Sequence, residues 1–231
     1  MYIVFEGIDG AGKSTQIRLL KEWLQDNGFR VETVVEPTDS EVGKLIRRIL
    51  KHPDANTDTF QNILGLLFAA DRMLIMDKLN DDSKIIISDR SFISSLAYQE
   101  NAEWIEVLNK YAKKPDLLIL MDLDVEKSVA RTSDGDTFEN VEFLTRVKEN
   151  YLEISKNFQC EIIDANNGIN KVSSDIKKAV APYGATAEKF LFIQELLCHQ
   201  QDNVSNERYH GYQQHRRYLH QQESGQHRLF P

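Results

Sequence analysis

Residues whose types and spacing suit phosphate chemistry lie close to the N-terminus of this 231-residue chain. Within residues 7–15, positions 7–14 fit the phosphate-loop pattern G-x-x-x-x-G-K-[ST] in full. Glycines in such a loop let backbone N–H groups wrap around phosphates, because no Cβ stands in the way. Lys13 is expected to neutralise the β- and γ-phosphates, and Ser14 to ligate Mg²⁺. We therefore expect a nucleoside triphosphate to bind Gly7, Ile8, Asp9, Gly10, Ala11, Gly12, Lys13, Ser14 and Thr15.

A second candidate pair, Asp89 and Arg90, follows a later apolar run. The carboxyl ends of parallel strands form the edge where such sheets bind their ligands. Asp89 is a candidate for holding Mg²⁺ or its water shell, and Arg90 for binding a phosphate through two hydrogen bonds. The alternative interpretation is an ion pair at a strand end with no function.

Phe68 and Arg72 lie four residues apart within a helical pattern from about Thr57 to Leu79. Residues at this spacing share one face of a helix. An aromatic plane beside a guanidinium suits a planar base that carries acceptor oxygens. Each residue also has a simpler interpretation, in which Phe68 belongs to the core and Arg72 is a solvated charge.

Short β-rich runs alternate with helical patterns over the first 184 residues. Continuously apolar runs predict parallel strands that are buried on both faces. Ile17, Leu20 and Leu24 share one face of the first helix, which Gly28 ends, and Asp124 is placed to cap a helix from Val125. We predict an α/β sandwich of five strands: Tyr2 to Phe5, Val31 to Val35, Ile85 to Ser88, Leu117 to Met121 and Glu161 to Ile163.

The composition is that of a globular domain, with 41% hydrophobic and 28% charged residues. A net charge of -8 argues against broad binding to nucleic acid or to anionic lipid. We find neither an 18-residue apolar run nor a signal-peptide pattern, and we predict a soluble cytoplasmic protein without membrane contact. Two widely separated cysteines, Cys160 and Cys198, support neither a zinc site nor a disulfide framework.

A compositional change after Gly184 predicts a domain over residues 1–184 and a separate tail over 185–231. The tail is rich in Gln and His and shows little apolar periodicity. We expect one amphipathic helix over 187–199 and disordered chain beyond it. Metal binding by the irregularly spaced His residues is the minor alternative.

The phosphate loop alone leaves several classes of nucleotide-binding protein open. No N-K-x-D string is present to hold guanine, which argues against a GTPase, and one domain is too small for a large motor. Five strings together resemble the thymidylate kinase family, and archaeal members most closely. They are FEGIDGAGKSTQ from Phe5, EPT from Glu36, LFAADR from Leu67, DR at Asp89 with SSLAYQ from Ser94, and PDLLILMDLD from Pro115.

The resemblance covers residues 1–182 and implies a P-loop NTPase fold with a short lid. It implies transfer of the ATP γ-phosphoryl group to dTMP, with Mg²⁺, giving dTDP and ADP for dTTP biosynthesis. It also implies a homodimer that packs through helices including residues 67–72. By the same resemblance, Phe68 stacks on thymine, Arg72 bonds to its carbonyl edge, and Asp9 contacts the 3′-hydroxyl. The full set of dTMP-binding candidates is Asp9, Pro37, Arg47, Phe68, Arg72, Arg90, Ser95, Tyr98 and Gln99, with Arg48 an alternative to Arg47.

The catalytic candidates are Lys13, Arg90, Arg131 and Asp9, and the metal candidates are Ser14 and Asp89. Two features depart from the family pattern. The expected lid, 132–138, contains no basic residue, which leaves Arg131 at its entrance as the lid arginine. Ser91 stands where the family carries a bulky residue, for which Phe92 is a candidate substitute.

The loop at Asp164 to Asn167 is expected beside adenine, although a polar turn has the same composition. Two rival functions stay open from the sequence. One is a kinase of another pyrimidine monophosphate, such as dUMP, UMP or CMP. The other is a nucleotide-binding regulatory protein without activity.

Overall fold

Five strands form one parallel sheet in the computed structural model, which describes residues 1–131 and 141–183. Their order across the sheet is β2-β3-β1-β4-β5, and each neighbouring pair is parallel. The predicted α/β class and all five predicted strands are confirmed, with ends that agree to within one residue. The bounds are β1 (Tyr2–Glu6), β2 (Val31–Val35), β3 (Ile85–Asp89), β4 (Leu117–Asp122) and β5 (Cys160–Asp164).

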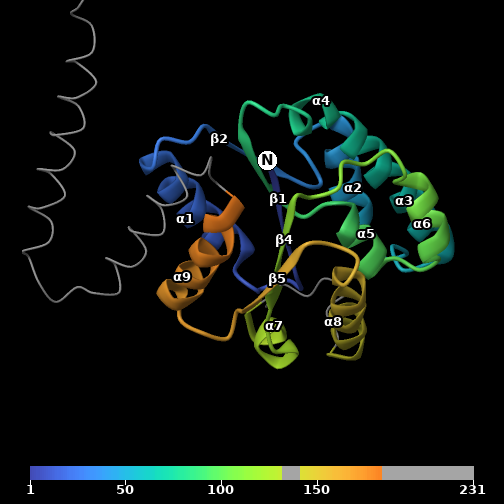
Figure 1. Ribbon diagram of the computed structural model, residues 1–231. Helices are drawn as coiled ribbons and strands as arrows, with labels where there is room; N and C mark the ends of the chain where they lie inside the picture. The colour runs from blue at the N-terminus through green and yellow to red at the C-terminus, as the bar shows by residue number, and fades with distance from the viewer. Residues whose placement is uncertain (132–140, 184–231) are drawn as a thin grey trace, which may run out of the picture. The chain divides into compact units, whose positions relative to one another are not determined.

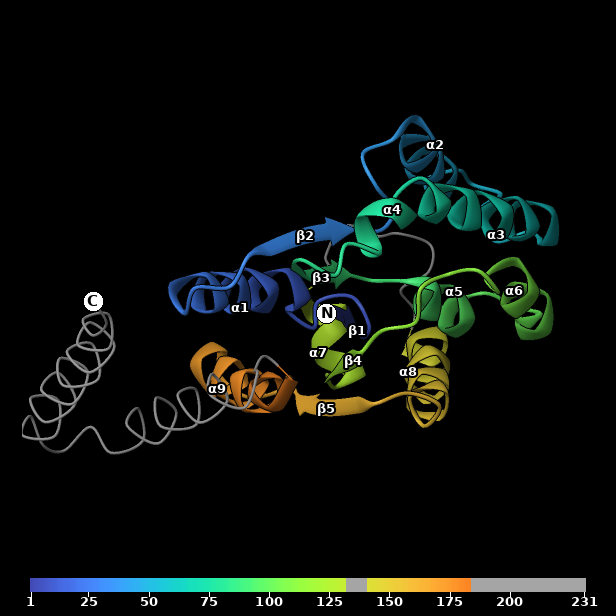
Figure 2. The same ribbon diagram turned by 45° about the horizontal axis from the view of Figure 1, so that its top comes forward.

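Helices cover both faces of this sheet and complete the predicted three-layer sandwich (Figure 1). Figure 2 shows α1 and α9 against one face, and α5 and α8 against the other. The described helices are α1 (Lys13–Asp26), α2 (Glu41–Leu50), α3 (Asp58–Met73), α4 (Met76–Leu79), α5 (Phe92–Tyr98), α6 (Ala102–Leu108), α7 (Val125–Arg131), α8 (Val141–Ser155) and α9 (Ile169–Val180), followed by a 3₁₀ turn at Ala181–Tyr183.

The three central strands carry the core. Every residue of β1 is buried, as are the residues of β3 and β4 except their last positions. The two edge strands are less buried than the apolar runs predicted, and Val35 and Ile162 are exposed. An edge strand has a neighbour on one side only, so burial on both faces applies to the central strands alone.

The first helix matches its predicted pattern. Ile17, Leu20 and Leu24 are buried in α1, and Gly28 follows the helix with a φ of 81°. The single helix predicted from Thr57 to Leu79 is wrong, because the chain leaves the α-helix after Met73 and resumes it at Met76.

The break in that helix coincides with a tightening of its last turn. The N–H of Leu74 donates to the carbonyl of Asp71, and that of Ile75 to Arg72, which are the short bonds of a tightening last turn. The side chains of Asp71 and Arg72 are both buried and bonded to the segment after β2. These buried bonds hold the end of α3 against that segment.

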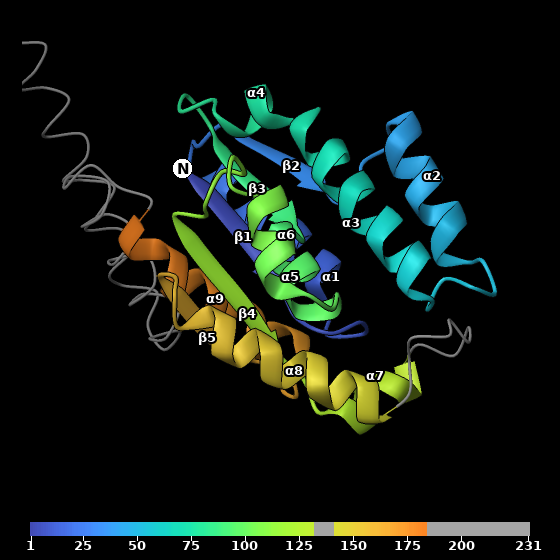
Figure 3. The same cartoon turned by 90° about the vertical axis from the view of Figure 1, so that its right-hand side faces the viewer.

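The parallel strands place the candidate residues at one edge. The phosphate loop follows β1, Asp89 ends β3, and the pair Glu36 and Pro37 follows β2. Figure 3 shows α2 and α3 side by side beyond the end of β2. None of the helices that the structure describes has both the length and the apolar character needed to cross a membrane.

Candidate active site

The loop at residues 7–12 joins β1 to α1. A Cβ at Gly7 would stand 2.5 Å from the carbonyl oxygen of Met121, so only glycine fits there. Gly12 precedes the helix with a left-handed φ of 88°, and no described side chain caps the helix. The first N–H groups of α1 therefore point from an uncapped N-terminus, which is a favourable place for a phosphate.

Lys13 is buried beneath this loop. Its Nζ donates to the carbonyl oxygens of Gly7, at 2.9 Å, and Ile8, at 3.1 Å. Burial and the neighbouring Arg90 guanidinium lower the pKa of Lys13 to about 8. The ammonium group is held in a site that disfavours its charge, which an arriving polyphosphate would stabilise.

Asp9 and Arg90 join the loop to the end of β3 through an ion pair. Burial opposes ionisation of Asp9, but the Arg90 and Lys13 cations outweigh it and lower the pKa of the carboxyl group. Arg90 has a left-handed φ of 72°, which is rare for a residue with a side chain. Such a backbone outlier in a ligand pocket is typical of a functional residue.

Ser14 and Asp89 meet at the base of the phosphate loop. The Ser14 Oγ donates to Oδ2 of Asp89 at 2.7 Å. A hydroxyl beside a carboxylate forms the hard oxygen donor set that suits Mg²⁺. The two residues that the sequence selected for metal binding are therefore adjacent and chemically suited to it.

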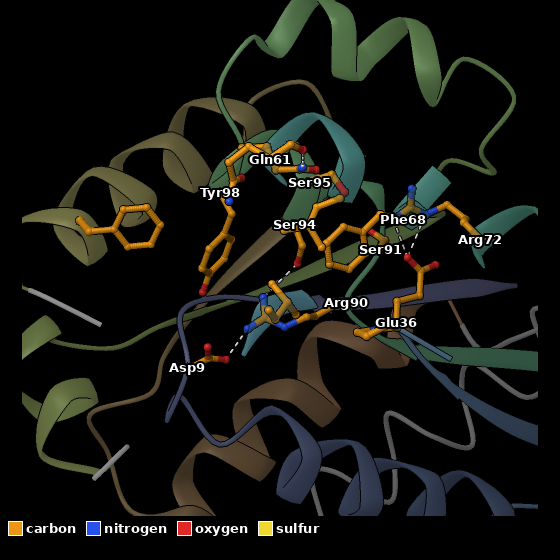
Figure 4. A pocket seen from close by; sticks show the side chains of 15 residues that line it. Asp9, Glu36, Gln61, Phe68, Arg72, Arg90, Ser91, Ser94, Ser95 and Tyr98 are labelled. Atoms are coloured by element: carbon orange, nitrogen blue, oxygen red, sulfur yellow. Dashed lines mark hydrogen bonds and ion pairs between the residues drawn. The ribbon is translucent and has the colours of Figure 1, made fainter. Parts of the chain in front are cut away.

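A pocket of about 940 Å³, including its open mouth, lies beside Arg90 (Figure 4). The structure brings eight of the nine predicted dTMP-binding residues together around it. They are Asp9, Pro37, Phe68, Arg72, Arg90, Ser95, Tyr98 and Gln99. The ninth, Arg47, does not line it.

Arg72 is 2% exposed, so its interpretation as a solvated charge is wrong. Its Nε and Nη2 donate to Oε2 of Glu36 at 2.8 and 2.6 Å, and its Nη1 donates to Oδ1 of Asn109. Burial raises the pKa of Glu36, although Arg72 acts against this shift. Glu36 and Asn109 thus hold the Arg72 guanidinium in one position at the wall of the pocket.

Two polar atoms of the pocket are buried without a hydrogen-bond partner among the described residues. They are Oε1 of Glu36 and Oε1 of Gln99. The Gln99 amide has one orientation, because its Nε2 donates to the carbonyl of Gln61 at 3.2 Å. Buried polar atoms are normally paired, so unpaired ones that line a pocket indicate a polar ligand.

The family model for thymidylate kinase matches residues 5–176 of this chain. The chain belongs to the thymidylate kinase family. A probable thymidylate kinase from Methanobrevibacter smithii is 76% identical over 183 residues, covering 79% of this chain and 95% of the relative. A second from Methanosphaera stadtmanae is 47% identical and covers 79% and 98%.

The fold of a thymidylate kinase from Candida albicans is similar, with a TM-score of 0.68. That solved structure is 24% identical in sequence and covers 82% of this chain and 92% of its own. The likeness supports the P-loop NTPase fold.

Arg47, the predicted contact to the monophosphate, stabilises a loop instead of lining the pocket. It donates to the carbonyls of Thr38, at 2.7 Å, and Pro37, at 2.5 Å, and it lies 3.5 Å from a carboxylate oxygen of Asp39. Arg131, the predicted lid arginine, donates to the carbonyl of Gly10 at 2.8 Å. Both cations are next to the site and engaged with its backbone.

Phe92 does not line the pocket and does not replace the bulky residue missing at Ser91, so that hypothesis is wrong. Phe92 is buried and its ring contacts Phe158 edge-on, with centroids 6.0 Å apart. Ser91 itself lines the pocket and caps α5, accepting a bond from the N–H of Ile93. Phe92 is the first residue of α5, and its packing against Phe158 in the core keeps the ring out of the pocket.

The loop from Asp164 to Asn167 forms a compact polar turn. Oδ1 of Asp164 accepts bonds from the backbone and side chain of Asn166, and Oδ2 accepts one from Asn167. These bonds explain the polar composition without a ligand, so the adenine assignment stays a prediction. The expected lid at 132–138 lies outside the described residues.

Sequence reasoning missed several residues of the site. Glu36 and Ser94 lie within strings that carry the family resemblance, but the sequence alone indicates no role for either. Glu6 is fully buried behind the pocket, and its bonding partners are up to 145 residues away. The other missed lining residues are Leu50, Gln61, Leu64 and Phe143.

Proposed function

We propose that this member of the thymidylate kinase family transfers the γ-phosphoryl group of ATP to the 5′-phosphate of dTMP, giving dTDP and ADP. The observation that carries this proposal is the pocket next to the phosphate loop. It combines a stacking ring, Phe68, with a fixed donor, Arg72, and an unpartnered acceptor on Gln99.

The base edge is read by a donor and an acceptor together. Thymine presents a carbonyl oxygen at position 4 and an N–H at position 3. Arg72 donates to the carbonyl, and Oε1 of Gln99 accepts from the N–H, since its amide orientation is fixed by Gln61. Cytosine presents the reverse pattern, with an amino group and a bare nitrogen, so it leaves both protein groups unpaired.

The sugar lies between Asp9 and Tyr98 in this proposal. Asp9 contacts the 3′-hydroxyl, and the Tyr98 ring leaves no room for a 2′-hydroxyl. The guanidinium carbon of Arg90 lies 5.2 Å from the centroid of the Tyr98 ring, which keeps the ring in place. The pocket therefore favours a deoxynucleotide.

Phosphoryl transfer requires alignment of two polyanions and neutralisation of their charge. Lys13 and Arg90 supply charge at the two sides of the reacting group. Arg47 and Arg131 add to it once phosphate oxygens replace their carbonyl partners. Asp9 orients Arg90 through their ion pair. No covalent intermediate is needed, because the acceptor phosphate is already a nucleophilic anion.

Ser14 and Asp89 would hold Mg²⁺ directly or through its water shell. The ion, when bound, would neutralise charge on the phosphates of ATP. The remaining nucleotide contacts come from the backbone of residues 7–12 and from the N-terminus of α1.

We also propose a homodimer. Ile63, Leu66 and Met73 form an exposed apolar row along α3, and Val107 on α6 is exposed as well. Such a row on one helix suits a partner surface. We keep the predictions of a cytoplasmic location, no nucleic-acid partner, and a kinase unit over 1–184 with a separate tail.

ADP release with ATP and Mg²⁺ tests the function across a panel of acceptors. We expect dTMP to give the highest kcat/KM, with dUMP next because it keeps the same base edge. We expect dCMP to be at least 100-fold poorer, and UMP to be poor because of its 2′-hydroxyl. A clear preference for dCMP or UMP would contradict the base and sugar assignments, and no stimulation by any acceptor would contradict kinase activity.

A further inference from the structure

Glu6 is a fully buried carboxylate at the last position of β1, directly before the phosphate loop. Its Oε1 accepts from the Ser91 hydroxyl at 2.8 Å and from the N–H of Ser94 at 3.1 Å. Its Oε2 accepts from the hydroxyls of Ser94, at 2.6 Å, and Tyr151, at 2.9 Å. Both oxygens are thus bonded, and three of the donors are hydroxyls.

Two of these hydroxyls also receive a bond from Arg90. Its Nη1 donates to Oγ of Ser94 at 3.0 Å and to the Tyr151 hydroxyl at 3.2 Å, while its Nη2 pairs with Asp9. Figure 4 shows Ser94 turned toward Arg90 on one side of the guanidinium and Asp9 on the other. Arg90 is therefore linked to Glu6 through two hydroxyl groups from separate helices, α5 and α8.

The charge on Glu6 sets the direction of this network. Each hydroxyl gives its proton to the carboxylate and so turns a lone pair toward Arg90. Burial and the Glu6 charge raise the pKa of Tyr151 far above its usual value, so this hydroxyl keeps its proton. Chains of hydrogen bonds that point the same way strengthen one another in a buried site.

We propose that Glu6 is a positioning residue for the kinase reaction, which it supports by fixing the Arg90 guanidinium through Ser94 and Tyr151. Glu6 lies behind these side chains and acts on the phosphates mainly through Arg90, beside a minor electrostatic effect on Lys13. This role rests on the proposed function, because it assumes that Arg90 contacts the acceptor phosphate.

Glu6→Gln is the direct test, because glutamine keeps the size of the side chain and replaces one acceptor with an NH₂ donor. Because the Ser94 N–H can only donate, the amide oxygen takes the place of Oε1 and the NH₂ group faces the Ser94 and Tyr151 hydroxyls. At least one of these hydroxyls must then turn its proton toward Arg90 or toward the other hydroxyl, 3.0 Å away, which weakens the hold on the guanidinium. We expect kcat/KM for dTMP to fall at least tenfold, with KM for ATP within twofold of the unmodified chain. In an Arg90→Lys background the same change should lower kcat/KM less than twofold, because the residue through which Glu6 acts is already gone.

Tyr151→Phe provides a second test that keeps the ring and removes one link. We expect kcat/KM for dTMP to fall three- to tenfold, without a change in KM for ATP. Ser155→Ala is the matched control, since it removes another buried hydroxyl from α8, one that bonds to the carbonyl of Leu152 at 2.8 Å and to Cys160 and does not line the pocket. Its activity should match that of the unmodified chain.

The outcomes separate this inference from the function itself. Equal losses for Glu6→Gln with and without Arg90→Lys would overturn the inference and indicate a structural role. Normal turnover of dTMP by Tyr151→Phe and Glu6→Gln would also overturn it and leave the proposed function intact. If Glu6→Gln fails to fold, Tyr151→Phe with its control decides the question. An unmodified chain that does not phosphorylate dTMP would overturn both proposals.

Discussion

At the scale of single residues, the proposed reaction depends on the charge of Lys13. Its pKa of about 8 means that the free protein loses this charge within the ordinary working range of pH. In the proposed function the ammonium form binds the polyphosphate, so kcat/KM for ATP should fall about tenfold per pH unit above pH 8. A profile that stays flat to pH 10 would contradict this assignment.

The lowered pKa of Lys13 also makes the stability of the fold depend on pH. An unfolded chain carries Lys13 with its ordinary pKa of 10.5, so it binds more protons than the fold between about pH 8 and 10.5. The contribution of Lys13 to stability therefore rises with pH over that window.

Lys13→Ala should abolish phosphoryl transfer at every pH. Lys44→Ala, which removes an exposed lysine of α2, should leave phosphoryl transfer unchanged.

Arg72→Lys tests the reading of the base. Lysine keeps the charge but loses the two-point bond with Glu36 and the planar donor that faces the base. Loss of one hydrogen bond to a charged group weakens binding by about 1.5–3 kcal/mol, so KM for dTMP should rise about 10- to 100-fold. Steady-state kinetics should show KM for ATP within twofold.

Arg18→Lys is the matched control, since Arg18 forms an exposed ion pair with Glu22 on α1. Equal increases in both KM values for Arg72→Lys would indicate damage to the fold in place of a lost base contact.

At the scale of elements, the segment between β2 and α2 positions the pocket. Asp71 on α3 accepts the N–H and hydroxyl of Thr38 and the hydroxyl of Ser40, all at 2.6 Å. Ser40 in turn accepts the N–H of Gly43 at 2.9 Å. This segment carries Pro37, which lines the pocket, and α2 carries Arg47, so its conformation links the helix to the acceptor site.

Gly43→Ala should disturb this segment. A Cβ at Gly43 would stand 1.9 Å from the carbonyl oxygen of Thr38, so the backbone must move. We expect a loss of about 1–3 kcal/mol in the free energy of unfolding and a higher KM for dTMP. Gly168→Ala is the control, because a Cβ there meets nothing within 4 Å. Denaturant unfolding that gives equal stability for the two variants would contradict the argument.

The elements differ in how well the sequence predicts them. Apolar runs and turn residues locate all five strands, because burial in a parallel sheet leaves a strong local pattern. The break after Met73 leaves no such pattern, since it follows from bonds that Asp71 and Arg72 make to residues about 33 and 36 positions earlier.

The site likewise contains residues that a contiguous motif identifies and residues whose positions depend on packing between distant segments. The phosphate loop is a contiguous string, and its residues are found from the sequence directly. The positions of Arg47 and Phe92 relative to the pocket depend on packing between elements, and neither residue lines the pocket. The contact of Arg47 with the monophosphate stays a prediction. The role of Glu6 depends on Ser91, Ser94 and Tyr151, which only the folded chain brings to it.

At the scale of the whole molecule, the apolar row on α3 predicts association. Light scattering after size exclusion should give about twice the chain mass of 26.7 kDa. Leu66→Asp places a charge in the row and should give the mass of one chain. Ile169→Asp changes another exposed apolar residue, on α9, and should keep the dimer. A single-chain mass for the unmodified protein would contradict the homodimer.

The tail gives the second prediction at this scale. The family match ends at residue 176, and every residue proposed for the site precedes it. Removing residues 185–231 should therefore leave kcat and both KM values within twofold of the full chain. A loss of solubility or activity, measured on purified protein, would show that the kinase unit requires the tail.

Transfer of the γ-phosphoryl group from ATP to dTMP can be followed directly by ³¹P NMR of the unmodified chain with ATP, dTMP and Mg²⁺. We expect dTDP and ADP to appear in equal amounts, and Lys13→Ala to form neither. Appearance of ADP with inorganic phosphate and no dTDP, or no reaction with dTMP present, would contradict the proposed function.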